Sequence, residues 1–314
     1  MQNYKLGVLL SAYNGEKYIT QQVESIMNQN NVDHITLLVR NDGSTDDTLE
    51  ILRKLEKKYT NLQVINGSNI GLIASFFELL RIGFQKFDFD YYSFSDRDDY
   101  WMKDKLESAI QYLSKENNDI PLLYGCRSVV VDEKLKPTGF LTQAQKRKLT
   151  FYNTAIQNIV IGHNQVLNKK LAKILINQKQ DFSNIYSQDL WITNVAAVSG
   201  KIVFENTPHA YYRMHENNQL GYGKGKLDRI RGHLIRLRKK EPQKMAIQLR
   251  FFADYYSKYL STDERHEIDN FFKQQDSLIN RKKYIRTMKL YRQNDKETKL
   301  FKILYLIGSY NIKD

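Results

Sequence analysis

Three carboxylates directly follow an aromatic segment near residue 95. Residues 91–95 read Tyr-Tyr-Ser-Phe-Ser, and Asp96, Asp98 and Asp99 come next. Aromatic residues favour a buried strand, whereas carboxylates are costly to bury without partners. A strand that ends in Asp-x-Asp therefore indicates a site for a cation, although a polar turn that caps the next helix is the alternative. Carboxylate oxygens suit Mg²⁺ or Mn²⁺, and these ions commonly hold the phosphates of a substrate.

Three strand–loop–helix repeats precede these carboxylates and would position them. The predicted strands span residues 5–10, 35–39 and 63–65. The polar loops that follow them span residues 11–16, 40–48 and 66–71. This alternation predicts an α/β fold with a parallel sheet and helices on its faces. Ligands of such sheets bind beyond the carboxyl ends of the strands, where all three loops and the Asp-x-Asp would lie.

The polar segments, taken in order, resemble those of the family 2 glycosyltransferases of GT-A fold. In the first half they are Ser11-Ala12-Tyr13-Asn14-Gly15, Asn41-Asp42-Gly43-Ser44-Thr45-Asp46-Asp47-Thr48, Asn69-Ile70-Gly71 and Ser95-Asp96-Arg97-Asp98-Asp99. In the second half they are Gly162-His163-Asn164 with Asn168, Gln188-Asp189-Leu190-Trp191 and Tyr212-Arg213-Met214-His215-Glu216-Asn217-Asn218. The resemblance covers roughly residues 5–221 and implies a Rossmann-like, mixed, mostly parallel sheet flanked by helices. Within the family, the chain is most similar to bacterial rhamnosyltransferases of surface-polysaccharide assembly.

Two residues depart from the pattern of the family. Gln188 stands where Glu or His is more usual, and Arg97 stands between the metal-site carboxylates where a neutral residue is common. Arg97 could pair with Asp96 or with a phosphate.

Transfer of a sugar from a nucleotide-sugar leaves a diphosphate, whose growing negative charge a divalent cation stabilises. Asp98 is the expected direct metal ligand, and Asp96 is expected nearby in a supporting or ribose-contacting role. His215 could complete the metal site, since neutral imidazole suits Mn²⁺. The alternative for His215 is an ordinary surface or core histidine.

The acceptor hydroxyl is a poor nucleophile and needs a base in line with the attacked carbon. Asp189, which precedes the apolar Leu190-Trp191 at a predicted helix start, is the expected base. The alternative is a helix N-cap, a position that Asp favours. One base opposite the leaving group implies a single displacement with inversion. The resemblance also places His163 and Trp191 on the acceptor side.

The nucleotide is expected at the first three loops. Asp42 can accept the N3–H of uracil or thymine, and Asn69 can reach the base or ribose. Ser11 and Tyr13 can supply backbone contacts and a stacking ring, and Asn14 belongs to the same group. Each of these residues is also compatible with simple turn chemistry.

The 314-residue chain contains 48 basic and 35 acidic residues, and the excess of positive charge lies at its C-terminal end. Residues 223–314 hold 23 basic and 11 acidic side chains, are nearly free of Gly and Pro, and read as helices. We therefore expect a catalytic domain at 1–222 and a basic, mainly helical appendage at 223–314. The single cysteine, Cys126, excludes an internal disulfide and is expected to be a buried small residue in a reducing compartment.

Residues 224–240 are expected to form a basic amphipathic helix that contacts an anionic membrane surface. The alternatives are a solvated helix packed on the catalytic domain and, far less favoured, a nucleic-acid contact, since no nucleic-acid module is recognisable. No signal peptide is expected, and no run of 18 apolar residues predicts a spanning helix.

These observations together predict an inverting, Mn²⁺- or Mg²⁺-dependent glycosyltransferase, cytoplasmic and peripheral at the inner face of the cell membrane. The donor would be a dTDP- or UDP-linked sugar, with L-rhamnose implied by the narrower resemblance, and the acceptor a lipid-linked glycan or oligosaccharide. The alternatives are a UDP-sugar enzyme acting on another acceptor and a non-catalytic scaffold that binds sugar nucleotides. The sequence leaves the oligomeric state open.

Overall fold

The structure is a computed structural model, and it describes residues 4–30, 34–177, 182–215 and 237–312. The chain divides into two compact units, which are described separately. The first unit comprises residues 1–143, 160–180 and 200–217, and the second comprises residues 144–159, 181–199 and 218–314. This grouping differs from the expected boundary at residue 222, because two earlier segments pack with the C-terminal helices.

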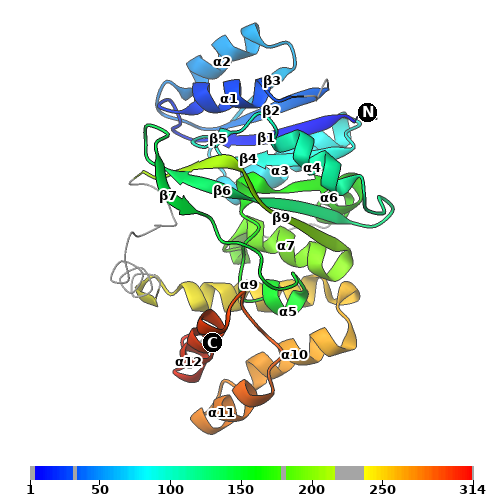
Figure 1. The fold of residues 1–314 in the computed structure, drawn as a ribbon, viewed down its shortest axis with the longest axis vertical. Helices are drawn as coiled ribbons and strands as arrows, with labels where there is room; N and C mark the ends of the chain where they lie inside the picture. The colour runs from blue at the N-terminus through cyan, green and yellow to red at the C-terminus, as the bar shows by residue number, and fades with distance from the viewer. Residues whose placement is uncertain (1–3, 31–33, 178–181, 216–236, 313–314) are drawn as a thin grey trace. The chain divides into compact units, whose positions relative to one another are not determined.

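A nine-stranded mixed sheet organises the described part of the first unit (Figure 1). Its strands lie in the order β3-β2-β1-β4-β8-β6-β9-β5, and β7 pairs with β6. The strands are β1 (Leu6–Ala12), β2 (Ile35–Asp42), β3 (Leu62–Gly67), β4 (Tyr91–Ser95), β5 (Tyr100–Trp101), β6 (Leu122–Val131), β7 (Pro137–Leu141), β8 (Val166–Asn168) and β9 (Lys201–Arg213). Strands β3, β2, β1 and β4 are parallel, as are β6 and β9, whereas β5, β7 and β8 pair antiparallel with their neighbours.

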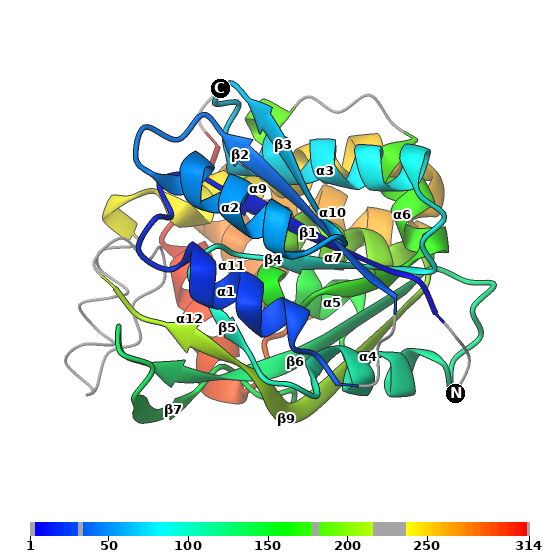
Figure 2. The same cartoon turned by 90° about the horizontal axis from the view of Figure 1, so that it is seen from above.

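Helices cover both faces of this sheet. On one face, alternate residues of β1 pack with α1 (Ile19–Met27), α2 (Thr48–Lys58) and α4 (Lys105–Leu113). On the other face, Gly83 of α3 (Leu72–Lys86) lies against Leu9 and Tyr92. Helix α6 (Lys169–Ile176) contacts α3, and Figure 2 shows these two helices side by side. The expectation of an α/β sheet flanked by helices is confirmed.

Coverage on both faces explains the apolar strands, because parallel strands buried on both sides need nearly continuous apolar residues. All seven residues of β1 and all five of β4 are buried. The sole cysteine, Cys126, is buried in β6, as expected. The carboxyl ends of the four parallel strands meet at one edge of the sheet, and the loops after β1, β2, β3 and β4 therefore converge there.

The second unit is helical and has an aromatic core. Its helices are α5 (Phe151–Thr154), η2 (Phe182–Asn184), α7 (Gln188–Ser199), α9 (Glu241–Tyr255), η3 (Ser257–Tyr259), α10 (Thr262–Lys273), α11 (Leu278–Thr287) and α12 (Asp295–Leu306). Ser261 caps α10 in a reciprocal capping box with Glu264, and Ser277 and Asn294 cap α11 and α12. None of the helices in the described ranges is long and apolar enough to cross a membrane.

Candidate active site

The loops after β1 and β2 are joined by hydrogen bonds at the carboxyl edge of the sheet. Asn14 Oδ1 accepts the backbone N–H of Thr45 at 2.9 Å, and the backbone N–H of Asn14 donates to Ser44 Oγ at 3.0 Å. The N–H of Gly15 donates to Thr48 Oγ1 at 2.7 Å. Asp46 accepts from the N–H of Thr48 at the start of α2, which fits a helix-start role. These hydrogen bonds fix the loop after β1 and the loop after β2 to each other.

Asp42, the expected partner of a pyrimidine, is buried at the end of β2. Its two carboxylate oxygens accept the backbone N–H groups of Ile70 and Gly71, each at 3.0 Å. The buried guanidinium of Arg40 pairs with the same carboxylate and donates to Ser68 O at 2.9 Å. The Arg40–Asp42 pair therefore fastens the loop after β3 to the end of β2, and sequence reasoning did not anticipate Arg40.

The other expected nucleotide contacts lie around this loop pair and differ in exposure. Ser11 is buried and donates to Ser75 Oγ at 2.7 Å, while the Tyr13 ring is exposed. Asn69 is exposed, and its Oδ1 accepts the N–H of Gly71 at 3.2 Å. Gly43 has a φ of 71°, and a Cβ at this position would lie 2.7 Å from the backbone N of Asn69. Tyr13 and Asn69 thus have surface available for a ligand, whereas Ser11 is available mainly through its backbone.

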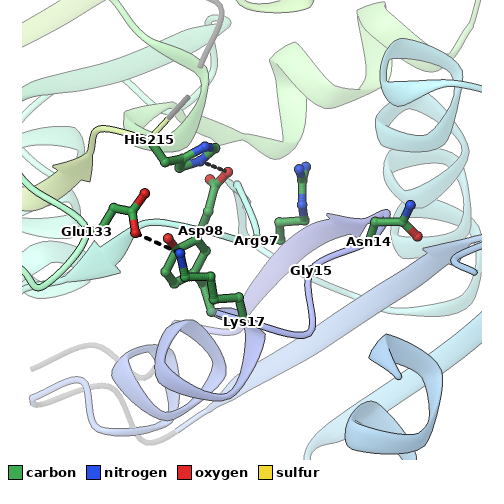
Figure 3. A pocket seen from close by; sticks show the side chains of 8 residues that line it. Asn14, Gly15, Lys17, Arg97, Asp98, Glu133 and His215 are labelled. Atoms are coloured by element: carbon green, nitrogen blue, oxygen red, sulfur yellow. Dashed lines mark hydrogen bonds and ion pairs between the residues drawn. The ribbon is translucent and has the colours of Figure 1, made fainter. Parts of the chain in front are cut away.

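Asp98 and His215 meet at a cavity of about 220 Å³ (Figure 3). His215 Nε2 lies 2.8 Å from Asp98 Oδ2, which brings together the two residues predicted to bind metal. Burial by itself would raise the pKa of Asp98, but the His215 hydrogen bond and the positive charge of Arg97 outweigh it, so this pKa is lowered. The cavity is lined by Asn14, Gly15, Lys17, Tyr18, Arg97, Asp98, Glu133 and His215.

Arg97 and Lys17 bring positive charge to this cavity. The Arg97 side chain lies over Gly15, where a Cβ would come 2.8 Å from Arg97 Cδ. Lys17 Nζ forms a 2.7 Å ion pair with Glu133, and both side chains are exposed. The wall of the cavity thus carries two cations, Arg97 and Lys17, and two carboxylates, Asp98 and Glu133.

Arg213 holds the segment that carries the carboxylates. This buried side chain donates through Nε to Asp98 O at 2.8 Å and through Nη1 to Glu133 O at 2.5 Å. Nη2 donates to Gln21 Oε1 at 2.8 Å, and the guanidinium lies 4.3 Å from the centre of the Tyr18 ring. Arg213 therefore connects the end of β4 with α1 and with the turn before β7.

A buried polar network lies beneath the carboxylates. Lys105 Nζ donates to Asn164 Oδ1 at 3.3 Å, which leaves Asn164 Nδ2 to donate to Ser128 Oγ at 2.7 Å. The Ser128 hydroxyl is then free to donate to His163 Nε2, 2.8 Å away. A neutral imidazole that accepts at Nε2 carries its proton on Nδ1. That nitrogen lies 3.0 Å from Asp99 Oδ2.

Burial governs the ionisation of this network. It lowers the pKa of His163 to about 3, with a further contribution from the charge of Lys105, so the ring is neutral at physiological pH. Burial raises the pKa of Asp99 well above its usual range, and the charges of Asp98 and Asp96 add to this effect. His163 is 0 % exposed, so it cannot touch an acceptor directly in this conformation. The structure places it under the carboxylates instead of on the expected acceptor side.

Two groups of side chains have a donor set that could hold a divalent cation. Asp96, Asp99 and His163 have ligand atoms within 4.8 Å of one another. Asp99 and His163 are almost completely buried, however, so an ion bound there could not reach a diphosphate. Asp98 and His215 face the cavity, and carboxylate with imidazole is a suitable set for Mn²⁺. The residues present therefore fit a metal at Asp98 and His215, while the partly exposed carboxylate of Asp96 lies 3.8 Å from His163 Nδ1.

Asp189 and Trp191 belong to the second unit, at the start of α7. Ser187 Oγ donates to Asp189 Oδ1, and the N–H of Leu190 donates to the same Asp189 oxygen at 2.8 Å and to Ser187 Oγ at 3.4 Å. Asp189 and Ser187 therefore both accept from the first turn of α7. Asp189 is half-buried in the first turn of α7, two residues after Ser187. Trp191 is fully buried among aromatic rings of α9, including Phe252 at 5.6 Å between ring centres. Trp191 is thus a core residue of the second unit and has no surface for an acceptor.

Several residues of the candidate active site were not predicted from the sequence, for different reasons. Arg40 could have been noticed as a lone cation in an apolar strand, and Arg213 as a member of the Tyr-Arg-x-His segment. Lys17 and Glu133 lie 116 residues apart in an exposed ion pair, and nothing in their local sequence marks them.

Comparison with known proteins identifies the family of the chain. Residues 8–175 match the model of the family described as "Glycosyl transferase family 2". A dTDP-rhamnosyl transferase, RfbG of Shigella flexneri, is 29% identical over 222 residues, which are 68% of this chain and 73% of that protein. A UDP-Glc:α-D-GlcNAc-diphosphoundecaprenol β-1,3-glucosyltransferase, WfaP of Escherichia coli, is 24% identical over 67% of this chain and 77% of its own length.

Two solved structures are similar in fold. S. aureus TarS 1–349 in complex with UDP-GlcNAc superposes with a TM-score of 0.60 at 18% identity, over 98% of this chain and 81% of that one. A mannosyltransferase from Pyrobaculum calidifontis, in complex with GDP-Man and Mn²⁺, superposes with a TM-score of 0.58 at 14% identity, over 98% and 86% of the two chains. The fold is GT-A, as expected. Because the family model matches more than half of the sequence, the chain belongs to glycosyl transferase family 2.

Proposed function

We propose that this protein is an inverting, metal-dependent glycosyltransferase that moves a sugar from a nucleotide-sugar to a glycan acceptor in cell-surface polysaccharide synthesis. The observation that carries the proposal is the Asp98–His215 pair, 2.8 Å apart at a cavity that also receives Lys17 and Arg97. A metal-ligating carboxylate and imidazole beside two cations form an environment for a diphosphate leaving group.

Asp98 and His215 would hold Mn²⁺ or Mg²⁺, and Asp96 would support them or contact the ribose. The bound cation would neutralise charge on the leaving diphosphate. Arg97 and Lys17 would bind the same phosphates from the wall of the cavity. Arg213 would keep this arrangement in place, because it bonds to the backbone of both Asp98 and Glu133.

Asp189 would act as the general base on the acceptor hydroxyl. Its carboxylate receives the Ser187 hydroxyl, which orients it at the first turn of α7. When the acceptor oxygen attacks the anomeric carbon, Asp189 takes the hydroxyl proton, and the bond to the diphosphate breaks on the opposite side. A single displacement of this kind inverts the anomeric configuration.

The nucleotide would bind at the joined loops after β1, β2 and β3. Tyr13 would stack on the base, and Asn69 would contact the base or ribose. Asp42 would accept the N3–H of uracil or thymine after it releases one of the two backbone N–H groups that its buried carboxylate holds. Ser11 and Asn14 would contribute through their backbone. The similarity to a dTDP-rhamnosyl transferase supports dTDP-L-rhamnose as the donor, whereas the similarity to a UDP-glucose enzyme supports a UDP-sugar.

The acceptor would be a lipid-linked glycan or oligosaccharide, and the enzyme would work at the cytoplasmic face of the membrane. The diphosphoundecaprenol-linked substrate named for WfaP supports such an acceptor. The helix expected at residues 224–240 lies mostly outside the described residues.

A panel of nucleotide-sugars tests the proposal. The full chain should release nucleoside diphosphate from one dTDP- or UDP-sugar when Mn²⁺ is present, and chelation should abolish the release. The Asp189→Asn variant should still bind that donor but fail to transfer its sugar. Binding of a nucleotide-sugar without turnover of any donor or acceptor would instead favour a non-catalytic scaffold.

A further inference from the structure

Helices α11 and α12 form a pair in the second unit whose opposite ends lie together. Arg281, in the first turn of α11, approaches Gly308 just beyond α12, and its Nη1 lies 3.4 Å from the position of a Cβ there. Asn311, further along, donates to Gln275 O ahead of α11 at 3.2 Å. The start of α11 therefore lies beside the end of α12. Tyr284 and Tyr305 face each other inside the pair, with ring centres 5.0 Å apart.

Four aliphatic side chains are exposed at this shared end. Leu278 and Ile279 of α11 are 50% and 70% exposed, and Ile303 and Ile307 at the end of α12 are 56% and 65% exposed. The face of α12 that packs in the core of the second unit is formed by Phe301 and Tyr305, which are completely buried. These four aliphatic residues, which we call the apolar tip, are thus surplus to the packing of the helix pair.

Basic residues continue the same exposed faces away from the apolar tip. On α12 the exposed positions 296, 299, 303 and 307 recur at helical spacing and read Lys, Lys, Ile, Ile. On α11 the aliphatic residues come first, because Leu278 and Ile279 are followed by exposed cations. Since the start of α11 lies beside the end of α12, the aliphatic residues of both helices lie at the same end of the pair. We call the five cations the basic collar: Lys282, Lys283, Arg286, Lys296 and Lys299.

The basic collar is available to an external anion. Within the part of the chain that the structure describes, none of its five members forms an ion pair with a carboxylate. Nearby Lys289, by contrast, pairs with Asp263 at 3.0 Å. The acidic residues of α12 are engaged elsewhere, because Asp295 pairs with Arg147 and Glu297 accepts from Gln157. The surface therefore combines exposed aliphatic side chains with five exposed cations that pair with no carboxylate in the described part of the chain. Asp276, an exposed carboxylate just before α11, accepts from Asn280.

We propose that the apolar tip and the basic collar form a docking surface for an anionic lipid bilayer. Exposed aliphatic side chains bordered by Lys and Arg suit an interface where acyl chains lie under negatively charged headgroups. The four side chains are enough to enter the headgroup boundary, and the collar supplies the attraction to the surface. This surface is independent of the expected helix at 224–240, and the proposal does not rest on the glycosyltransferase reaction.

Co-sedimentation of the full chain with vesicles tests the proposal without any donor or acceptor. Binding to vesicles that contain phosphatidylglycerol should be strong at low salt, weak at high salt and weak to phosphatidylcholine alone. The Ile279→Ser/Ile307→Ser variant should lose about tenfold in binding to anionic vesicles, because two inserted aliphatic side chains are removed. Both residues are mostly exposed, so the fold should remain stable. The matched control is Ile247→Ser, which removes an exposed isoleucine of α9.

A second pair of variants tests how much the charge of the basic collar contributes to vesicle binding. Lys282→Gln/Lys283→Gln should weaken binding by about fivefold per residue. Lys57→Gln/Lys273→Gln, which removes the same charge at exposed positions outside the basic collar, should weaken it much less. Donor turnover in solution should be normal in all of these variants, which separates this proposal from the proposed function.

Three results would overturn the proposal. One is equal binding to neutral and anionic vesicles. Another is a loss of binding that occurs only when Arg229, Arg231, Arg236 and Arg238 are changed to Gln, which would assign the contact to residues 224–240. The third is a dimer, detected by sedimentation velocity, that the Ile279→Ser/Ile307→Ser variant dissociates while vesicle binding is unchanged. The apolar tip would then be a contact between two copies of the chain.

Discussion

His163 Nδ1 lies 3.0 Å from Oδ2 of Asp99, the third of the carboxylates that follow β4, and both side chains are almost completely buried. The ring is fixed from its other side by Ser128, which is itself oriented by Asn164. The pair thus joins the η1 turn (Gly162–Asn164) to the residue next to Asp98. A neutral, oriented imidazole at this position stiffens the segment that carries the expected metal ligands.

This burial predicts a pH dependence of stability. His163 keeps a pKa of about 3 in the folded protein, against an ordinary value near 6.5, so the unfolded chain binds the extra proton between these limits. The contribution of His163 to stability should therefore fall as the pH decreases from 6.5 towards 3, with a slope of up to about 1.4 kcal/mol per pH unit. The raised pKa of Asp99 acts in the opposite direction, so the effect of His163 is the difference between the parent protein and a variant without it.

Urea unfolding at several pH values between 7 and 4 would measure that slope. His163→Gln should be less stable at pH 7 but should show a flatter dependence below pH 6.5. His266→Gln, which removes an exposed histidine of α10, is the control and should keep the slope of the parent protein. An unchanged slope in His163→Gln would mean that other groups control the acid response.

Asp98→Ala should abolish sugar transfer and remove the effect of Mn²⁺ on nucleotide binding. The substitution deletes the carboxylate that faces His215 and the cavity. Calorimetric titration of nucleoside diphosphate with and without Mn²⁺ is the measurement, and Asp119→Ala, at an exposed position, is the control. Equal metal dependence in parent and variant would remove Asp98 from the metal site.

Asp189→Asn should keep donor binding and lower kcat by about 10²–10⁴, the usual contribution of a general base. Asn retains the shape and an acceptor oxygen but cannot take up the proton. Ser187→Ala removes the hydroxyl that caps α7 and should reduce stability by about 1 kcal/mol. A near-normal kcat for Asp189→Asn would refute the base role, and an effect confined to thermal stability would make Asp189 a helix-start residue only.

The nucleotide pocket should prefer uracil and thymine over guanine and adenine. Calorimetry with UDP, dTDP, GDP and ADP would compare the four bases, and Asp42→Asn should remove the preference. Because Asp42 also pairs with Arg40 and accepts two backbone N–H groups, the variant should be less stable as well. Arg40→Gln, which disturbs the same loop but keeps the carboxylate, separates the two effects. Tighter binding of GDP would contradict both the role of Asp42 and the rhamnose donor.

The sequence predicted those parts of the structure that depend on local patterns. The strands expected at 5–10, 35–39 and 63–65 are found at Leu6–Ala12, Ile35–Asp42 and Leu62–Gly67. Apolar runs bounded by polar loops are sufficient to locate such strands. Asp98 also lies beside His215, from which 117 residues separate it, and this is compatible with the expectation that His215 could complete the metal site.

Features that depend on packing between distant segments were not predictable in this way. Residues 144–159 and 181–199 join the C-terminal helices through aromatic contacts such as Phe151 with Phe252, which no local periodicity reveals. The burial of Trp191 has the same cause, because its partners in α9 lie about 60 residues further along the chain. His163 was misplaced because a polar residue in a polar segment gave no indication that Ser128 and Asp99 would enclose it.

The bonds between the loops after β1 and β2 have a consequence for how nucleotide specificity can be altered. Asn14 and Gly15 each depend on a partner in the other loop, so neither loop has a complete set of hydrogen bonds alone. Grafting one loop from a relative would leave orphaned donors and let the other loop move, which would raise the entropy cost of binding. A graft of residues 13–18 together with 43–48 would bring both partners of each hydrogen bond between the loops. The two loops therefore have to be exchanged together, as a single unit.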